Sequence, residues 1–359
     1  MPSSRIRQEI DMFQDLGIRY PIVQAPMAGV STPALAAAAS NAGALGSLGI
    51  GASTVPQARK MIQDTRAHRQ ANQRERLLPR TAVRDAAREA AWLRHLAPVF
   101  AEVGSPPPTE IDEIYRTFLG DDEALQMLIE ERPAVVSFHF GMPSADALAA
   151  LRKAGIKTMA SATNLREAAA LEEAGIDAVV AQGIEAGGHR GVFDTDAIDE
   201  RLSMSVLVRL LVRQSKLPVI AAGGIMDGFG IRAALDLGAA GAQLGTAFVL
   251  CPESSADASY RANLKSARAA VTRLTTTLSG RPARGIVNRF IEHAEAAGRP
   301  DIAAYPVAYD AAKQLNAAAA KLGNSEFAAQ WAGQGAPLAR EMPAADLVAT
   351  LVAEAKLEG

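Results

Sequence analysis

A histidine in a glycine-rich loop is the feature of this sequence that points most directly to chemistry. Residues 178–191 read as an apolar strand that ends at Gln182 and opens into a loop holding His189. Three glycines flank the histidine: Gly187, Gly188 and Gly191. Glycine lets backbone approach a flat or phosphorylated ligand where a Cβ would collide, and an imidazole titrates near neutrality. This pattern predicts a reactive site at a strand end, and a glycine-rich connection with a solvated histidine is the alternative.

Composition limits the class of protein. The 359 residues are 49% hydrophobic, enough for one large α/β barrel, and a net charge of -2 does not suggest a nucleic-acid partner. The single cysteine, Cys251, excludes a disulfide framework and is typical of a reducing compartment. The start of the chain lacks the apolar core of a signal peptide, and no run approaches a membrane span. We therefore expect a soluble, cytoplasmic protein with no membrane partner and no obligate protein partner.

Apolar strands alternate with helices along most of the chain. Seven strands are predicted, at 21–27, 44–50, 134–138, 157–161, 177–182, 217–224 and 241–246. Continuous apolar strands separated by helices indicate a parallel sheet covered on both faces. We predict an α/β fold, a (β/α)8 TIM barrel formed by residues 1–250, with residues 251–359 as a helical extension over the active-site mouth. A doubly wound open sheet is the alternative, disfavoured because the first strand is not followed by a G-x-G-x-x-G fingerprint.

The loops after the last two barrel strands have the composition of an anion site. A phosphate commonly lies on these loops in TIM barrels. The residues with suitable backbone amides are Gly223, Gly224, Gly245 and Thr246. Tight packing that needs small residues is the alternative. Metal binding is not expected, because the five histidines do not have the spacing of metal ligands. A catalytic cysteine is not expected either, because no obvious base accompanies Cys251 to activate it as a nucleophile.

Five short motifs follow one another along the chain, at residues 24–29, 41–46, 182–189, 222–224 and 243–246. Together they resemble the FMN-dependent nitronate monooxygenases, formerly called 2-nitropropane dioxygenases. Two C-terminal segments, 276–286 and 305–313, are similar to the class I enzymes of that family. The resemblance runs from about residue 20 to about residue 350.

The resemblance implies a set of site residues. FMN would be bound by Met27, Gln182, Gly187, Gly188, Gly223, Gly224, Gln243, Leu244, Gly245 and Thr246. The catalytic residues would be His189 and His139, and substrate would be bound by Tyr115, Tyr260, Tyr305, Tyr309 and Lys313. Taken alone, Tyr115 and Tyr260 would be ordinary surface tyrosines and Lys313 a solvated lysine, and only the joint match singles these residues out.

The implied reaction is oxidation of an alkyl nitronate, of the propionate-3-nitronate type, by O2 without nicotinamide. It would pass through a flavin semiquinone and yield an aldehyde with nitrite or nitrate. The two histidines would hydrogen-bond the nitronate oxygens, and Lys313 would pair with the substrate carboxylate. For a neutral nitroalkane, His189 is the candidate base, with a reference pKa of about 6.5.

The chain departs from the family at residues 65–82. The third barrel strand of the family reads like Asn-Val-Asn-Val-Phe, whereas this chain has a polar, basic stretch with Arg74, Glu75 and Arg76. Codons for residues 70–80 can be chosen so that a shifted frame restores the family's strand, which suggests a local frameshift that sequencing of the coding DNA would test. Burying unpaired charges costs several kcal/mol each, so we predict a looped-out or disordered segment, lower stability and weaker FMN binding.

Two further functions share some of these features. A flavin-dependent enoyl-ACP reductase or NAD(P)H:quinone reductase has the same loop before the histidine, although the set of Tyr305, Tyr309 and Lys313 argues against it. A non-catalytic barrel is supported only by the unusual segment.

Overall fold

Eight parallel strands form a closed barrel in a computed structural model of the chain, which describes residues 12–67, 72–77 and 84–357. The strands are β1 (Ile22–Gln24), β2 (Gly46–Gly49), β3 (Asn72–Leu77), β4 (Val135–His139), β5 (Lys157–Ala162), β6 (Ala178–Gln182), β8 (Val219–Ala222) and β9 (Gly241–Leu244). They follow one another around the sheet, and β1 pairs with β9. Hydrogen bonds of 2.8 and 2.9 Å join Leu45, just before β2, to Ile22 and Gln24 and close the ring. The predicted TIM barrel is confirmed.

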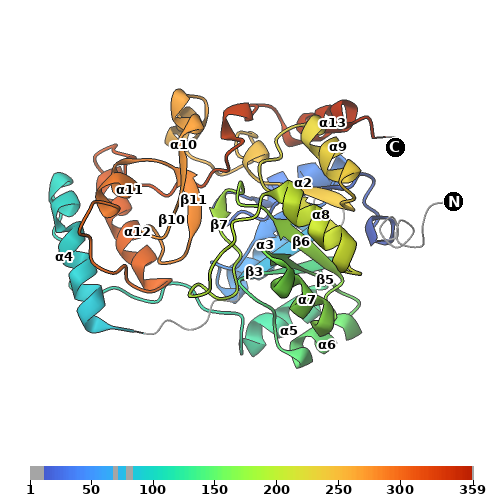
Figure 1. Cartoon of the computed structure of the whole chain (residues 1–359), viewed down its shortest axis with the longest axis horizontal. Coiled ribbons are helices and arrows are strands. Elements are labelled where there is room, and N and C mark those ends of the chain that lie inside the picture. The colour runs from blue at the N-terminus through green and yellow to red at the C-terminus, as the bar shows by residue number, and fades with distance from the viewer. Residues whose placement is uncertain (1–11, 68–71, 78–83, 358–359) are drawn as a thin grey trace.

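Eight helices of the described part of the chain surround these strands. They are α2 (Pro33–Asn41), α3 (Val55–Ala67), α5 (Asp122–Glu131), α6 (Ala145–Lys153), α7 (Leu165–Ala174), α8 (Met204–Gln214), α9 (Gly228–Asp236) and α13 (Ala344–Ala355). Local chemistry sets their ends: Thr32 caps α2 through its side chain with Pro33 at the first position, and Gly175 ends α7 in the left-handed conformation. The last helix, α13, packs on α9 and α2 and completes the ring of helices (Figure 1).

Residues 72–77 are a barrel strand, contrary to the predicted looped-out segment. The backbone of β3 pairs in parallel with β2 from Gly46 to Gly49 and with β4 from Val135 to His139. A (β/α)8 barrel needs one strand more than the seven predicted, and β3 supplies it between the second and third of them although its composition is polar. Neighbouring strands on both sides provide a hydrogen-bonding ladder that overrides strand propensity. The rest of the unusual segment, 68–71 and 78–83, lies outside the described residues.

A second hydrophobic core lies beside the barrel. It joins α4 (Ala86–Glu102) to α11 (Arg289–Ala294) and α12 (Val307–Ala320), around Trp92, Phe100 and Phe290. Figure 1 shows α4 next to these two C-terminal helices, away from the barrel. The division of the chain at residue 250 stays a prediction, but the packing places α4 with the C-terminal unit and α13 with the barrel.

A small antiparallel sheet connects this second unit to the histidine loop. It contains β10 (Thr272–Thr275), β11 (Ala283–Ile286) and β7 (Gly188–His189), in the order β10-β11-β7. Because β11 pairs with β7, the C-terminal unit holds the loop that carries His189. A short helix, α10 (Ala258–Leu264), follows the barrel in the chain.

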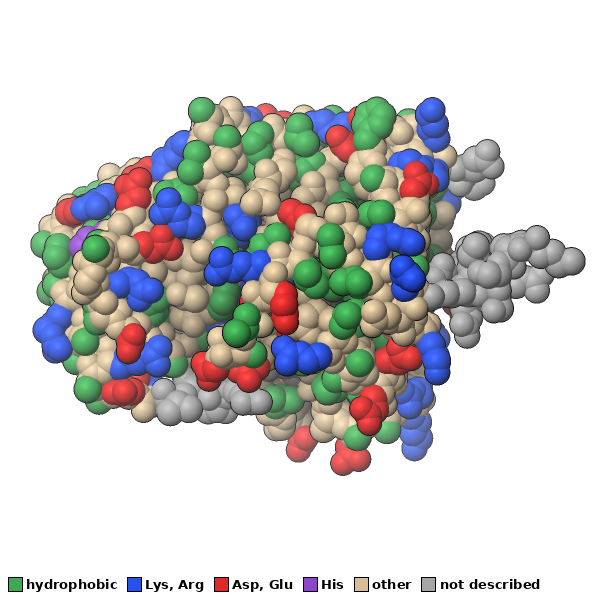
Figure 2. All heavy atoms as spheres, in the orientation of Figure 1, with side chains coloured by type: hydrophobic (Ala, Val, Ile, Leu, Met, Phe, Trp, Pro, Cys, Tyr) green, Lys and Arg blue, Asp and Glu red, His purple; other side chains and the backbone are tan. Residues whose placement is uncertain are grey.

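The surface carries both signs of charge. Figure 2 shows lysine and arginine interspersed with aspartate and glutamate over the face in view. Among the described helices, none has the length and apolar character needed to span a membrane.

Gly46 tests how tightly the helices pack on the barrel. A Cβ on Gly46 would lie 1.8 Å from the carbonyl oxygen of Ala36 in α2. We expect Gly46→Ala to lower the free energy of unfolding by at least about 2 kcal/mol, because backbone cannot move aside as a side chain does. Gly230→Ala in α9 is the control, since its Cβ would meet nothing closer than 3.3 Å. Equal denaturant midpoints for the two variants would contradict this packing.

Candidate active site

A cavity of about 750 Å³ lies at the carboxyl ends of the barrel strands and is closed on one side by the C-terminal unit. The predicted FMN residues that line it are Met27, Gln182, Gly187, Gly188, Gly223, Gly224, Gln243, Gly245 and Thr246. The predicted catalytic and substrate residues that line it are His139, His189, Tyr115, Tyr260, Tyr305, Tyr309 and Lys313. Leu244 differs from these residues, because it is 1% exposed and packs in the barrel core. The structure thus brings together nearly every residue that the sequence singled out.

Gln182 fastens the histidine loop to the end of β6. Its side-chain nitrogen donates to the carbonyl of His189 at 2.9 Å, and its side-chain oxygen accepts from the amide of Gly191 at 2.7 Å. The amide group of Gln182 is therefore engaged with the protein's own backbone, and its predicted FMN contact finds no support in this geometry.

His139, at the end of β4, also holds the loop. Its Nε2 lies 3.0 Å from the carbonyl oxygen of His189, and its Nδ1 lies 2.9 Å from the Ser161 hydroxyl. Since a carbonyl only accepts, Nε2 carries the proton and Nδ1 accepts from Ser161. Burial, reinforced by the positive charges of Arg281 and Arg190, lowers the pKa of His139 to about 4. Both nitrogens of this neutral ring are engaged within the protein, so His139 positions the loop.

His189 is buried among aromatic rings. Its ring centroid lies 5.3 Å from that of Trp331, 5.6 Å from Phe140 and 5.6 Å from Tyr305. Its Nε2 lies 2.9 Å from the hydroxyl of Ser279. Burial, helped by His139 and Arg281, lowers the pKa of His189 to about 3, so the ring is neutral at physiological pH.

Tyrosines and one lysine form one wall of the cavity. Tyr115 comes from the loop between α4 and α5, and the other residues of this wall come from the C-terminal unit. Burial raises the pKa of Tyr115 and of Tyr309 to about 12, so both phenols stay protonated. The ammonium of Lys313 lies 4.8 Å from the ring centroid of Tyr115 and 5.3 Å from that of Tyr309, within cation–π range. Lys313 is exposed at the cavity mouth, and no carboxylate of a described residue lies within ion-pair distance of it.

Tyr260 and Tyr305 are also buried against this wall. The hydroxyl of Tyr260 donates to the carbonyl of Trp331, which directs that phenol to the protein and away from a ligand. Burial raises the pKa of Tyr260 and of Tyr305. Tyr305 faces the rings of His189 and Phe140 edge-on.

The opposite side of the cavity has the features of an anion and cofactor site. Gly223 and Gly224, after β8, have φ angles of +117° and +72°, which favour glycine and turn the backbone sharply at the strand end. The side-chain oxygen of Gln243 in β9 is buried, and no described residue donates a hydrogen bond to it. Unsatisfied buried polar atoms are rare in folded proteins, so a ligand with a donor would explain this one.

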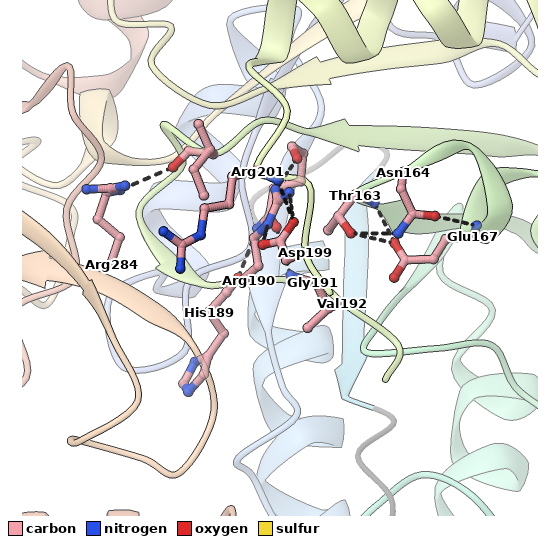
Figure 3. Close-up of polar contacts among 12 residues, drawn as sticks. Thr163, Asn164, Glu167, His189, Arg190, Gly191, Val192, Asp199, Arg201 and Arg284 are labelled. Carbon is pink, nitrogen blue, oxygen red and sulfur yellow. Dashed lines mark hydrogen bonds and ion pairs between the residues drawn. The ribbon is translucent and has the colours of Figure 1, made fainter. Parts of the chain in front are cut away.

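Ion pairs and capping bonds support the histidine loop from behind (Figure 3). Arg190 forms a bidentate ion pair with Asp199, with both bonds at 2.9 Å. The Arg190 guanidinium also donates to the carbonyl oxygen of Gln182 at 2.5 Å. Glu167 at the start of α7 accepts from the amide of Thr163 at 2.6 Å and from the amide of Phe193 at 2.9 Å. The loop is therefore anchored at both ends.

Several residues of the site were not predicted from the sequence. Phe140 and Trp331 line the cavity beside His189. Ser161 is hydrogen-bonded to His139, and Ser279 is hydrogen-bonded to His189. Ser279 lies within the 276–286 segment that carries the class I resemblance, which is the one signal that pointed to it. Two glycines of the loop are required by packing within the protein. A Cβ on Gly187 would lie 2.5 Å from the amide nitrogen of Gly333, and a Cβ on Gly191 would lie 2.9 Å from the His139 ring.

A TIM barrel with neutral histidines, an aromatic wall and glycine-rich strand ends defines an enzyme acting on a small molecule. Comparison with known proteins gives the family. The family model for nitronate monooxygenase matches residues 11–354. A nitronate monooxygenase of Pseudomonas aeruginosa is 57% identical over 94% of this chain and 97% of its own length.

Solved structures agree with this. The nitroalkane oxidase of Streptomyces ansochromogenes has a TM-score of 0.89 and 39% identity, covering 96% of this chain and 98% of that one. FabK from Thermotoga maritima has a TM-score of 0.71 and 29% identity, covering 97% of this chain and 95% of that one. The chain belongs to the nitronate monooxygenase family and is an oxidoreductase.

The buried histidines predict a pH-dependent stability. Their folded-state pKa values, about 3 and about 4, lie below the ordinary value, so the unfolded chain binds protons that the folded chain does not as pH falls. Stability should therefore be lost between pH 7 and 5, by about 2 kcal/mol for each histidine.

Denaturant unfolding at both pH values measures this loss. His189→Asn should lose less stability than the wild type over the same interval, because one of the two titrating rings is gone. An identical pH dependence in wild type and variant would show that His189 titrates normally in the fold.

Proposed function

We propose that the chain is an FMN-dependent nitronate monooxygenase that oxidises alkyl nitronates of the propionate-3-nitronate type with O2 to an aldehyde and nitrite or nitrate. The single observation that carries this proposal is the cavity in which an unsatisfied Gln243 oxygen and the Gly223–Gly224 turn face an aromatic, cationic wall. Membership of the nitronate monooxygenase family supports the same reaction.

The residues present fit FMN. The carbonyl oxygen of the Gln243 side chain can accept a hydrogen bond from a flavin ring N–H, and the backbone at Gly223, Gly224, Gly245 and Thr246 can bind the phosphate. Thr246 is held in place because its hydroxyl accepts from the amide of Gly333 at 3.0 Å. Bound there, FMN supplies the electron transfer that connects nitronate to O2.

The second unit provides the groups for an anionic substrate. Lys313 offers a cation at the mouth for the substrate carboxylate, and its two tyrosine neighbours restrict where the ammonium can lie. His189 presents a neutral ring to the cavity, held through Ser279. The ring can hydrogen-bond a nitronate oxygen without carrying a charge of its own.

Removal of a proton from a neutral nitroalkane finds less support. A base with a pKa of about 3 is a weak acceptor for an α-proton, so the ordinary value expected from the sequence does not apply to His189. We infer that the substrate arrives as the nitronate anion. The His139 ring, engaged on both nitrogens, contributes by fixing the backbone of His189.

An NAD(P)H-dependent flavin reductase is the second candidate. The structural similarity to FabK shows that this barrel fold also occurs in a protein that is not named as a nitronate monooxygenase. Oxygen uptake on propionate-3-nitronate without NADH, by protein supplemented with FMN, supports the monooxygenase. Rapid bleaching of the flavin by NADH, with no uptake on the nitronate, supports the reductase.

Lys313 provides a test of substrate orientation. Lys313→Met should raise KM for propionate-3-nitronate by about tenfold, which corresponds to the loss of one charge-assisted hydrogen bond. Ethyl nitronate has no carboxylate, so its KM should change little. The control is Lys321→Met, an exposed lysine at the end of α12. An equal rise in KM for both nitronates would exclude a carboxylate contact.

Gln243 provides a test of the cofactor site that needs no turnover. Gln243→Leu removes the unsatisfied acceptor, so the Kd for FMN should rise about tenfold, as measured by quenching of flavin fluorescence. Gln214→Leu, at the exposed end of α8, is the matched control. Unchanged FMN affinity in Gln243→Leu would show that this oxygen does not face the flavin.

A further inference from the structure

Arg281 is a buried arginine without an acidic partner. Its exposed fraction is 7%, and no carboxylate of a described residue lies within ion-pair distance of its guanidinium. One nitrogen donates to the carbonyl of Val192 at 2.5 Å, whereas Nε is buried and without a partner among the described residues. Burying a cation without a counter-charge lowers the stability of the folded protein. A buried, unpaired arginine therefore indicates a functional role.

The guanidinium lies directly behind the cavity wall. It stacks over the Phe140 ring at 4.2 Å from the centroid, and that ring lines the cavity and lies 5.6 Å from the His189 ring. The turn from Ser279 to Arg281 also contacts His189 directly, through the side chain of Ser279. The Ser279 hydroxyl oxygen lies 2.9 Å from Nε2 of His189 and 3.1 Å from the carbonyl oxygen of Arg281.

The Ser279 hydroxyl thus lies between the His189 ring and the backbone of Arg281. The turn from Ser279 to Arg281 therefore both holds the His189 ring and carries the charge behind the cavity wall.

We propose that Arg281 is a positioning residue that makes the cavity selective for anions: its buried, unpaired guanidinium supplies the positive potential that a nitronate needs, without touching the substrate. The inference rests on the proposed function for the identity of the anion, but the selectivity itself is a property of the cavity. In a site shielded from water, one fixed charge a few ångströms behind the wall acts far more strongly than an exposed one.

The electrostatics of the surrounding groups agree with this role. Burial lowers the pKa of Arg281 to about 10, while Tyr305, Glu167 and Asp194 raise it, so the group stays cationic at neutral pH. Its charge also lowers the pKa of His189 and of His139, after burial has lowered both. The positive charge near the substrate thus belongs to the arginine and is absent from the two imidazoles.

Binding of two small probes tests the proposal. Nitrate is a planar anion shaped like the nitronate head group, and 2-methyl-2-nitropropane is always neutral because it has no α-proton. For FMN-supplemented protein, Arg281→Met should weaken nitrate binding about tenfold in calorimetric titration and leave the neutral probe unchanged. Arg281→Lys, which keeps the charge, should stay within about threefold of wild type.

The control is Arg273→Met on β10, where an exposed arginine pairs with Glu295. If the methionine variant does not fold, Arg281→Gln, which keeps a donor for the Val192 carbonyl, makes the same comparison. The acid limb of the pH–rate profile should move to higher pH in the neutral variants, since His189 and His139 lose a nearby positive charge.

Three results would overturn the proposal: wild-type nitrate affinity in the neutral variants, equal weakening of both probes, or no nitrate binding by the wild type. The nitrate titration does not depend on turnover. Arginine-dependent nitrate binding without oxygen uptake on nitronates would therefore refute the proposed function and leave the inference standing.

Discussion

The carbonyl oxygen of His189 receives two hydrogen bonds, from Nε2 of His139 and from the side chain of Gln182, and the rest of the site depends on them. The donors come from the ends of β4 and β6, so the barrel itself determines where the loop lies. A rigid sheet fixes such donors more accurately than a loop would. On its other side the loop is held as strand β7 by β11, a part of the C-terminal unit. His189 therefore lies where the two units of the molecule meet.

Burial explains most of the chemistry of this junction. Imidazoles removed from water lose their charge, which leaves His139 and His189 neutral. The carbonyl of His189 then fixes the tautomer of His139, because Nε2 must donate to it. Arg281, in contrast, stays cationic because a guanidinium retains its proton even when buried. Lys313 lies exposed at the cavity mouth. A cavity with neutral rings and cations at two depths supports the proposed substrate, an anion with charge at both ends.

Much of this architecture could be predicted from the sequence because it is local. The alternation of apolar strands with helices predicted the barrel. Strand β3 was not expected from its composition, since its polar residues gave no strand signal and its hydrogen bonds come from β2 and β4. The placement of α4 against α11 and α12 depends on contacts between residues nearly 200 positions apart, as in the bond from His293 to the carbonyl of His95, and no local pattern reveals these.

The roles of site residues were harder to predict than their membership of the site. His139 and Gln182 were expected to face a ligand, and both are in the cavity wall, yet their polar atoms are used on the backbone of the histidine loop. Ser279 and Trp331 reach His189 from the far end of the chain. A motif shows that a polar residue matters at a position, but only the geometry shows which atom it offers and to what. In this site that distinction separates the groups that we propose to bind the nitronate, His189 and Lys313, from the groups that hold the histidine loop in place.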